Sequence, residues 1–138
     1  VSDRYGYHLS LRVDQIEHYQ NLNDETLVSK FLEQLVKEIG FRVVAGPLSK
    51  KVETPDEHIG VSSIVILYES HAAIHTYANI RSAFIDVFAC REFSVERVFD
   101  IIQRFFGNHK ITEKHLSPRG DNWSKDAQRE LERWRATR

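Results

Sequence analysis

An apolar run from Val61 to Leu67 is the feature that most limits how this chain can fold. The run is rich in valine and isoleucine and shows no clean alternation with polar residues. That pattern is typical of a central strand covered on both faces. A second run, 83–90, does alternate. It predicts a strand with Ala83, Ile85, Val87 and Ala89 packed against helices, and with Phe84, Asp86, Phe88 and Cys90 on the opposite face.

Three further segments read as strands. Tyr7–Val13 alternates apolar and polar residues, as a half-buried strand does. Phe41–Leu48 predicts a strand that ends near Gly46-Pro47, and Lys110–Leu116 predicts the last strand. The polar segment Lys50–His58, which contains a proline, predicts a mobile loop.

Two segments have helical periodicity. In the first, apolar residues recur at every fourth position from Leu27 to Ile39, after a capping residue at Asn23 or Asp24 and before Gly40. In the second, Ser94 precedes a segment that carries Val95, Val98, Ile102 and Phe105 on one face and ends at Gly107-Asn108.

The order strand, helix, strands, helix, strand predicts an α+β two-layer sandwich, a mainly antiparallel sheet with both helices on one face. We expect one domain over residues 1–120. A linker at Pro118–Trp123 leads into a C-terminal tail, residues 121–138. There a short charged helix over Ser124–Trp134 has only Ala127, Leu131 and Trp134 as its apolar stripe, so we expect it to be solvated and docked by its two tryptophans.

Composition limits the setting and the partners. The chain has 19 basic and 20 acidic residues, and this near neutrality argues against a nucleic-acid or membrane-surface partner. One cysteine excludes an internal disulfide framework. No signal pattern opens the sequence, and no apolar run approaches the ~20 residues of a membrane helix. These features predict a soluble cytoplasmic protein.

The reactive side chains gather after the first apolar run. Glu69-Ser70-His71 follows it directly, His75 comes four residues after His71, and Cys90 closes the next run. Two histidines at this spacing could bind zinc, but no third ligand lies at a usual spacing, so we expect no metal site. A lone cysteine is commonly a small buried hydrophobic residue, and that reading of Cys90 stays open on composition alone.

The segment 60–76, with its apolar strand, Glu69-Ser70-His71 and His75, resembles the prokaryotic S-adenosylmethionine decarboxylases. The Asp86-Val-Phe-Ala-Cys90 strand and the opening Tyr5-Gly-Tyr-His-Leu9 are also similar to that family, so the likeness spans roughly residues 5 to 120. Members of the family are made as proenzymes that cleave themselves.

The resemblance implies that this chain makes its own cofactor, a pyruvoyl group derived from Ser70, with no metal or pyridoxal phosphate. Ser70 would attack the carbonyl of Glu69, and cleavage would give a β chain, 1–69, and an α chain, 70–138. A decarboxylase needs such an electron sink because no ordinary side chain can hold the electrons that carbon dioxide leaves behind. The pyruvoyl carbonyl would capture the substrate amine as a Schiff base.

The same resemblance assigns roles to other side chains. His75 would be the acid/base of processing, because a serine hydroxyl is a poor nucleophile by itself. Cys90 would return a proton to the substrate, a duty that suits a thiol protonated at neutral pH. In a straight strand His75 and Ser70 would lie on opposite faces, so we expect a kink or bulge at Glu69-Ser70.

One departure from the family pattern concerns the substrate. The family's ribose-binding glutamate is replaced by Asn79, within Tyr77-Ala78-Asn79. An amide can bond a hydroxyl, but without charge assistance. We expect His71, Asn79, Phe84 and Phe88 to contact the substrate. It would be S-adenosylmethionine or, as in related self-cleaving enzymes, L-arginine or L-ornithine.

Two further expectations concern assembly and class. A sandwich with one open sheet face, bearing Phe84 and Phe88, predicts a homodimer with sites near the subunit boundary. The alternative class is a non-processing paralogue that acts as a binding or regulatory subunit.

Overall fold

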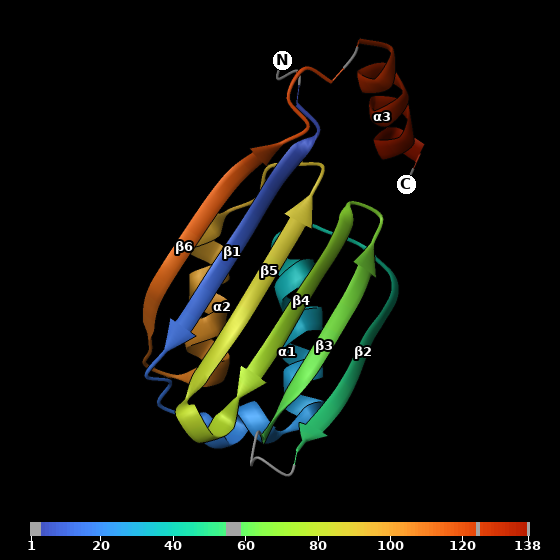
Figure 1. Ribbon diagram of the computed structural model, residues 1–138. Coiled ribbons are helices and arrows are strands. Elements are labelled where there is room, and N and C mark those ends of the chain that lie inside the picture. The colour runs from blue at the N-terminus through green and yellow to red at the C-terminus, as the bar shows by residue number, and fades with distance from the viewer. Residues whose placement is uncertain (1–3, 55–58, 124, 138) are drawn as a thin grey trace.

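The computed structural model describes residues 4–54, 59–123 and 125–137. Figure 1 shows one sheet with two helices behind it and a third helix at one end. The elements are β1 (Gly6–Asp14), the 3₁₀ helix η1 (Tyr19–Asn23), α1 (Glu25–Glu38), β2 (Val43–Glu53), β3 (Ile59–Leu67), β4 (Ser70–Tyr77), the 3₁₀ helix η2 (Ala78–Ile80), β5 (Ser82–Ala89), α2 (Val95–Phe106), β6 (Lys110–Arg119) and α3 (Lys125–Thr137).

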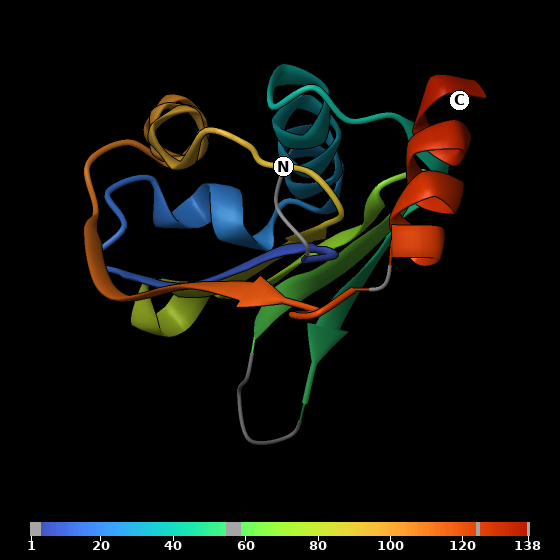
Figure 2. The same ribbon diagram turned by 90° about the horizontal axis from the view of Figure 1, so that it is seen from above.

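The sheet is fully antiparallel among the described residues, with six strands in the order β2-β3-β4-β5-β1-β6. Seen from above, α1 and α2 both lie on one face, and the other face is left open (Figure 2). The predicted α+β two-layer sandwich is therefore confirmed. None of the helices formed by the described residues is long and apolar enough to cross a membrane.

The core lies between the two helices and the covered sheet face. Side chains from β1, β4 and β5 alternate inward, and the apolar stripes of α1 and α2 pack on them. Its largest fully buried apolar side chains are Leu9, Ile16, Leu22, Phe31, Leu32, Leu35, Ile74, Ile85, Ile101, Ile102 and Phe106.

The structure selects Asp24 from the two predicted caps of α1 and confirms Ser94 as the cap of α2. The Asp24 carboxylate accepts a hydrogen bond from the Leu27 N–H at 3.1 Å and starts α1. The Ser94 hydroxyl accepts one from the Arg97 N–H at 3.1 Å and starts α2. Each cap satisfies one of the backbone donors that a helix start leaves free.

β2 differs from its prediction. It does not end at Gly46-Pro47 but runs on to Glu53, so Lys50–Glu53 is strand where we expected loop, and 55–58 lies outside the described residues. Gly46-Pro47 falls where the pairing of β2 with β3 shifts register, and Gly46 has a φ of +94°. Because β2 is the edge strand, a residue without an N–H is tolerated at such an irregularity.

β3 is also covered differently from what its sequence suggested. Val61, Ser63, Val65 and Leu67 are buried, whereas Ile64 and Ile66 are about half exposed, at 46% and 52%. The strand is thus covered on one face only within a single chain. Its apolar sequence therefore leaves isoleucine side chains on the open face.

The C-terminal elements also extend further than predicted. β6 continues through Pro118 to Arg119, the first residues of the expected linker, and α3 continues to Thr137. β6 is the other edge strand, so Pro118, which has no N–H, is tolerated there as Pro47 is in β2. The division into a domain 1–120 and a tail 121–138 stays a prediction.

Asp14 ties three strands together at the end of β1. Its carboxylate accepts hydrogen bonds from Ser82 of β5 and Thr112 of β6, and it pairs with Arg12 at 2.9 Å. Burial raises the pKa of this carboxyl, but the two hydroxyls and the Arg12 guanidinium outweigh that effect and hold the pKa below its ordinary value.

This lowered pKa makes stability depend on pH. A carboxyl with a lowered pKa stabilises the fold above its unfolded-state pKa, and this contribution is lost as pH falls through the folded-state value. We expect Asp14→Asn to lower the free energy of unfolding by about 1.5–3 kcal/mol at neutral pH, the range for hydrogen bonds to a charged group. Urea unfolding from pH 7 down to pH 2 should show a shallower acid loss in the variant. An acid limb as steep as that of the parent chain would contradict the assignment.

Candidate active site

The chain reverses direction at Tyr68-Glu69. Leu67 of β3 pairs directly with Ser70 of β4, so a two-residue turn joins the strands. Ser70 has a φ of +142°, a region that side-chain-bearing residues rarely adopt. The expected kink at Glu69-Ser70 is present in a stronger form, as a full hairpin turn.

The Glu69 side chain is buried and fixes this turn. Only 1% of it is exposed, and its carboxylate accepts the Arg42 backbone N–H at 3.0 Å and the Arg42 guanidinium at 3.4 Å. The Tyr68 N–H in turn donates to the Arg42 carbonyl at 3.0 Å. A buried carboxylate needs such partners, so the turn is anchored to the segment before β2.

The carbonyl oxygen of Glu69 points at the backbone of Cys90. The Cys90 N–H donates to it at 2.9 Å, just after the pair that Ser70 forms with Ala89 of β5. A backbone donor here withdraws electron density from the carbonyl carbon and would stabilise negative charge on its oxygen. The Cys90 side chain is 98% buried, because β5 ends at Ala89 and Cys90 leaves the strand alternation.

The Ser70 hydroxyl forms a hydrogen bond with the phenol of Tyr5 at 3.0 Å. Tyr5 lies just before β1, whose first residue, Gly6, passes close to β5. A Cβ on Gly6 would lie 2.0 Å from the Ala89 carbonyl oxygen and 2.7 Å from the Cys90 Cα. The glycine therefore permits the close approach that brings Tyr5 and Cys90 together around Ser70.

Two of the predicted substrate-contacting residues lie at this end of the sheet. His71 and Phe88 pack edge to face, with ring centroids 5.6 Å apart, and Tyr5 lies 5.6 Å from Phe88. Both side chains belong to the open sheet face, opposite α1 and α2. Arg119 of β6 lies over the Phe88 ring at 4.2 Å.

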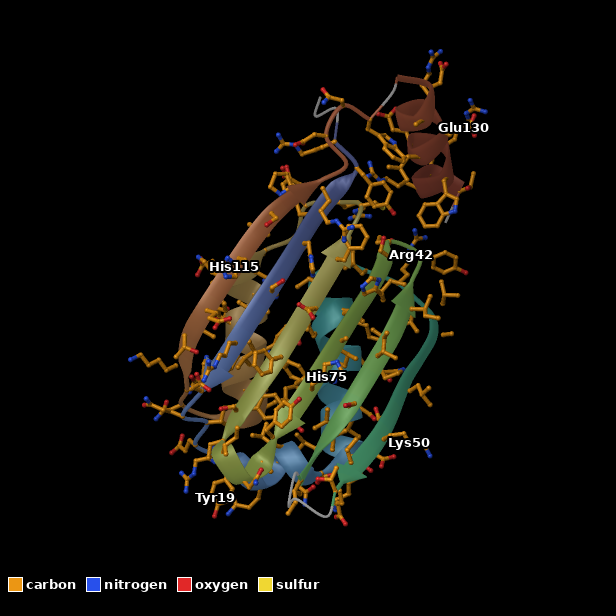
Figure 3. All side chains as sticks on the ribbon, viewed as in Figure 1. Tyr19, Arg42, Lys50, His75, His115 and Glu130 are labelled. Carbon is orange, nitrogen blue, oxygen red and sulfur yellow. The ribbon has the colours of Figure 1, made fainter. Side chains whose placement is uncertain are left out.

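The other predicted site residues lie further along the sheet. His75 is five residues from Ser70 in β4, a separation of about 16 Å at the rise of an extended strand, and its Nδ1 bonds Ser62 of β3 at 2.9 Å. Phe84 pairs with His75, and Asn79 lies in η2 beyond the strand. Figure 3 shows His75 on the sheet face, away from Arg42 at the turn.

The structure thus divides the predicted residues into two groups. Glu69, Ser70, His71, Phe88 and Cys90 lie at the turn end, whereas His75, Asn79 and Phe84 lie toward the other end. Within one chain His75 cannot reach the Ser70 hydroxyl. The prediction that His75 is the acid/base of processing is therefore not met by the geometry of a single chain.

A pocket lies beside each of these two groups of residues. A pocket of about 190 Å³ reaches Cys90, Tyr5 and Gly6, and residues of α3 line its far side. Asn79 lines a separate pocket of about 280 Å³ with Tyr19 and Asn23. Among the residues that the structure describes, no three His, Cys, Asp or Glu side chains gather to hold a metal ion.

The sequence matches the family model described as S-adenosylmethionine decarboxylase over residues 8–119. The chain belongs to this family. A relative from Methanococcus maripaludis strain C5, named S-adenosylmethionine decarboxylase proenzyme, is 33% identical over 107 residues, which are 77% of this chain and 83% of the relative. A relative of the same name from Acetivibrio thermocellus is 37% identical over 71 residues, 51% of this chain and 53% of the relative.

The fold has a solved counterpart. The crystal structure of the adenosylmethionine decarboxylase from Aquifex aeolicus VF5 superposes with a TM-score of 0.68 at 23% identity, covering 85% of this chain and 92% of that one. At this identity the likeness shows the fold alone. The S-adenosylmethionine decarboxylase match itself ends at residue 119, before α3.

Sequence reasoning missed three residues of the site. Tyr5 was noted only as part of the opening strand, although it bonds Ser70, and Arg42 and Ser62 were not singled out. The Tyr5 and Arg42 contacts join segments far apart in sequence, whereas Ser62 and His75 are directly paired in the β3–β4 hairpin and need its register to be known. Only a buried glutamate that requires a partner could have pointed to Arg42.

Gly6 supplies a test of this geometry. Gly6→Ala places a methyl group against the backbone of Ala89 and Cys90, which cannot rotate away, so β1 and β5 must separate. We expect destabilisation of about 1–3 kcal/mol and faster reaction of the Cys90 thiol with Ellman's reagent in the folded chain. Ser10→Ala, in the same strand, is the control and should leave thiol reactivity unchanged. Equal reactivity in Gly6→Ala and the parent chain would refute the close approach.

Proposed function

We propose that this chain is a proenzyme that cleaves itself between Glu69 and Ser70 and then decarboxylates S-adenosylmethionine with a pyruvoyl group. The observation that carries the proposal is the contact between the Cys90 N–H and the Glu69 carbonyl, beside a Ser70 hydroxyl held at a strained turn. The names of the relatives, S-adenosylmethionine decarboxylase proenzyme, support the same activity.

The residues present fit self-cleavage. The Ser70 oxygen would add to the Glu69 carbonyl carbon, and the negative charge on the carbonyl oxygen would be stabilised by the Cys90 N–H. The C–N bond then breaks as the C–O ester bond forms, which relieves the positive φ at Ser70. Removal of the Ser70 α-proton expels Glu69 as a carboxylate and leaves dehydroalanine. Tautomerisation and hydrolysis by one water release ammonia and complete the pyruvoyl group.

The pyruvoyl carbonyl at position 70 supplies the electron sink that decarboxylation requires. Cys90 is the proposed proton donor, because its N–H bonds the Glu69 carbonyl and it lines a pocket together with Tyr5, whose phenol bonds the Ser70 hydroxyl. Its burial also fits the packing reading of a lone cysteine, so the proton-donor role rests on this position next to residue 70. His71 and Phe88 would contact the substrate from the open face.

S-adenosylmethionine is the proposed substrate because the relatives carry its name. Asn79 would bond a ribose hydroxyl in place of the family's glutamate. L-arginine and L-ornithine, which need no such contact, remain the competing substrates.

We further propose a homodimer that joins the open sheet faces. Ile64, Ile66 and Phe84 are 42–52% exposed and lie on that face. If two copies pack with β4 strands antiparallel, the Ser70 end of one copy lies over the His75 end of its partner. This arrangement would bring the hydrogen-bonded Ser62 and His75 to a Ser70 that their own chain cannot reach.

Self-cleavage is tested on a denaturing gel. The purified parent chain should give two fragments of about half its 16.1 kDa, one with a blocked N-terminus, and should release carbon dioxide faster from S-adenosylmethionine than from L-arginine or L-ornithine. Ser70→Ala should stay intact and release none from any of the three. An intact parent chain would favour the non-processing paralogue. Faster carbon dioxide release from L-arginine or L-ornithine would identify that amino acid as the substrate in place of S-adenosylmethionine.

A shared site makes a distinct prediction for mixed chains. His75→Ala alone should stay uncleaved, because it lacks the acid/base of processing. Coexpressed with Ser70→Ala, it should be cleaved in heterodimers, where an intact His75 faces an intact Ser70. Gel analysis of tagged chains measures this rescue, and Lys114→Ala is a matched control that should process normally. The absence of rescue, or a monomer by light scattering at micromolar concentration, would contradict the arrangement.

A further inference from the structure

The C-terminal tail contacts Tyr5 at both its backbone and its ring. The Tyr5 N–H donates to the Gly120 carbonyl at 3.1 Å, and the Trp123 ring packs edge to face on the Tyr5 ring with centroids 5.3 Å apart. A Cβ on Gly120 would lie 2.5 Å from the Tyr5 Cβ, so only glycine permits this approach. An ion pair between Arg4 and Asp121 at 3.3 Å adds to the attachment.

The second tryptophan of the tail reaches the other side of the Glu69–Ser70 bond. Trp134 of α3 packs against Tyr68 with ring centroids 6.1 Å apart, and Tyr68 directly precedes Glu69. The tail therefore contacts Tyr68, the neighbour of Glu69, and Tyr5, whose phenol bonds the Ser70 hydroxyl. Between them, Tyr5, Tyr68, Trp123 and Trp134 line a groove of about 570 Å³.

The position of α3 in the fold also places it close to the candidate active site. Figure 1 shows α3 at the end of the molecule where β1 begins and β3 turns into β4. Figure 2 shows that α3 stands to one side of the sheet, so it leaves the open face uncovered for a partner. Leu131, Glu132 and Arg135 of α3 also line the pocket that reaches Cys90.

A nucleophile's rate depends steeply on its position. Misplacement of a reacting group by about 1 Å can cost about 100-fold in rate. Tyr5 precedes the first residue of β1, so the sheet ladder does not hold it. Its hydrogen bond and ring contact with the tail act together with its packing on Phe88 to keep its phenol at the Ser70 hydroxyl.

We propose that the segment from Gly120 to α3 is a positioning element for self-cleavage, in which Trp123 acts through Tyr5 to orient the Ser70 hydroxyl. This inference rests on the proposed self-cleavage. It assigns a role to a segment that lies outside the part of the chain matched by the family model. Trp123 is a positioning residue and touches no reacting atom.

The test follows cleavage of newly synthesised chains over time. Trp123→Ala should slow cleavage about tenfold, whereas Trp123→Phe, which keeps a ring, should cleave at nearly the parent rate. Arg129→Ala, on the exposed side of α3, is the matched control and should have no effect. Hydroxylamine cleaves an ester but not a peptide bond, so hydroxylamine-dependent fragments should fall in Trp123→Ala in parallel with the rate.

A double-mutant cycle separates positioning from general stabilisation. Tyr5→Phe keeps the ring contacts and removes only the phenol hydroxyl, so it should slow cleavage about as much as Trp123→Ala, and the double variant should be no slower than Tyr5→Phe alone. Additive losses, or a parent rate in Trp123→Ala, would overturn the proposal. Even if Trp123→Ala fails to fold, a parent rate in Tyr5→Phe would overturn it. A parent chain that never cleaves would instead refute the proposed function.

Discussion

The turn at Tyr68-Glu69 depends on burying a carboxylate, and the rest of the site depends on the turn. Glu69 can be buried because Arg42 supplies both a backbone N–H and a guanidinium to its carboxylate. With the side chain fixed, the Glu69 carbonyl is directed at the Cys90 N–H, and Ser70 is left with a positive φ. One buried carboxylate, held by the backbone and side chain of a half-exposed arginine, thus sets the direction of the peptide bond that is proposed to break.

The antiparallel sheet explains why the proposed chemistry is divided between two ends. β4 carries Ser70 at its start and His75 five residues later, and an extended strand cannot bring these side chains together. The same sheet leaves isoleucine and phenylalanine side chains on an uncovered face. A two-fold partner on that face would cover those apolar groups and unite the two halves of the site. Both the stability of the open face and the proposed catalysis would then require the dimer.

The tail adds a third contribution from the same chain. Its Trp123 packs on Tyr5, whose phenol bonds the Ser70 hydroxyl. Its Trp134 packs on Tyr68, which directly precedes Glu69 in the sequence. α3 is charged on most of its surface and has a narrow apolar stripe. The aromatic contacts therefore supply much of what attaches it to the sheet.

The sequence by itself determined the two-layer fold, the Ser94 cap and the family, and it narrowed the first cap to Asn23 or Asp24, because hydrophobic periodicity, capping residues and a linear motif are local patterns. It also indicated a break at Glu69-Ser70, from the role that the family resemblance gives His75 together with the parity of residue positions along a strand. Tertiary structure alone decided that the break is a complete reversal, that Gly46-Pro47 lies within an edge strand, and that Cys90 leaves its strand's alternation to become buried. It alone brought Tyr5, Arg42 and Trp123 to the turn, because those contacts join segments whose proximity depends on the register of the folded sheet.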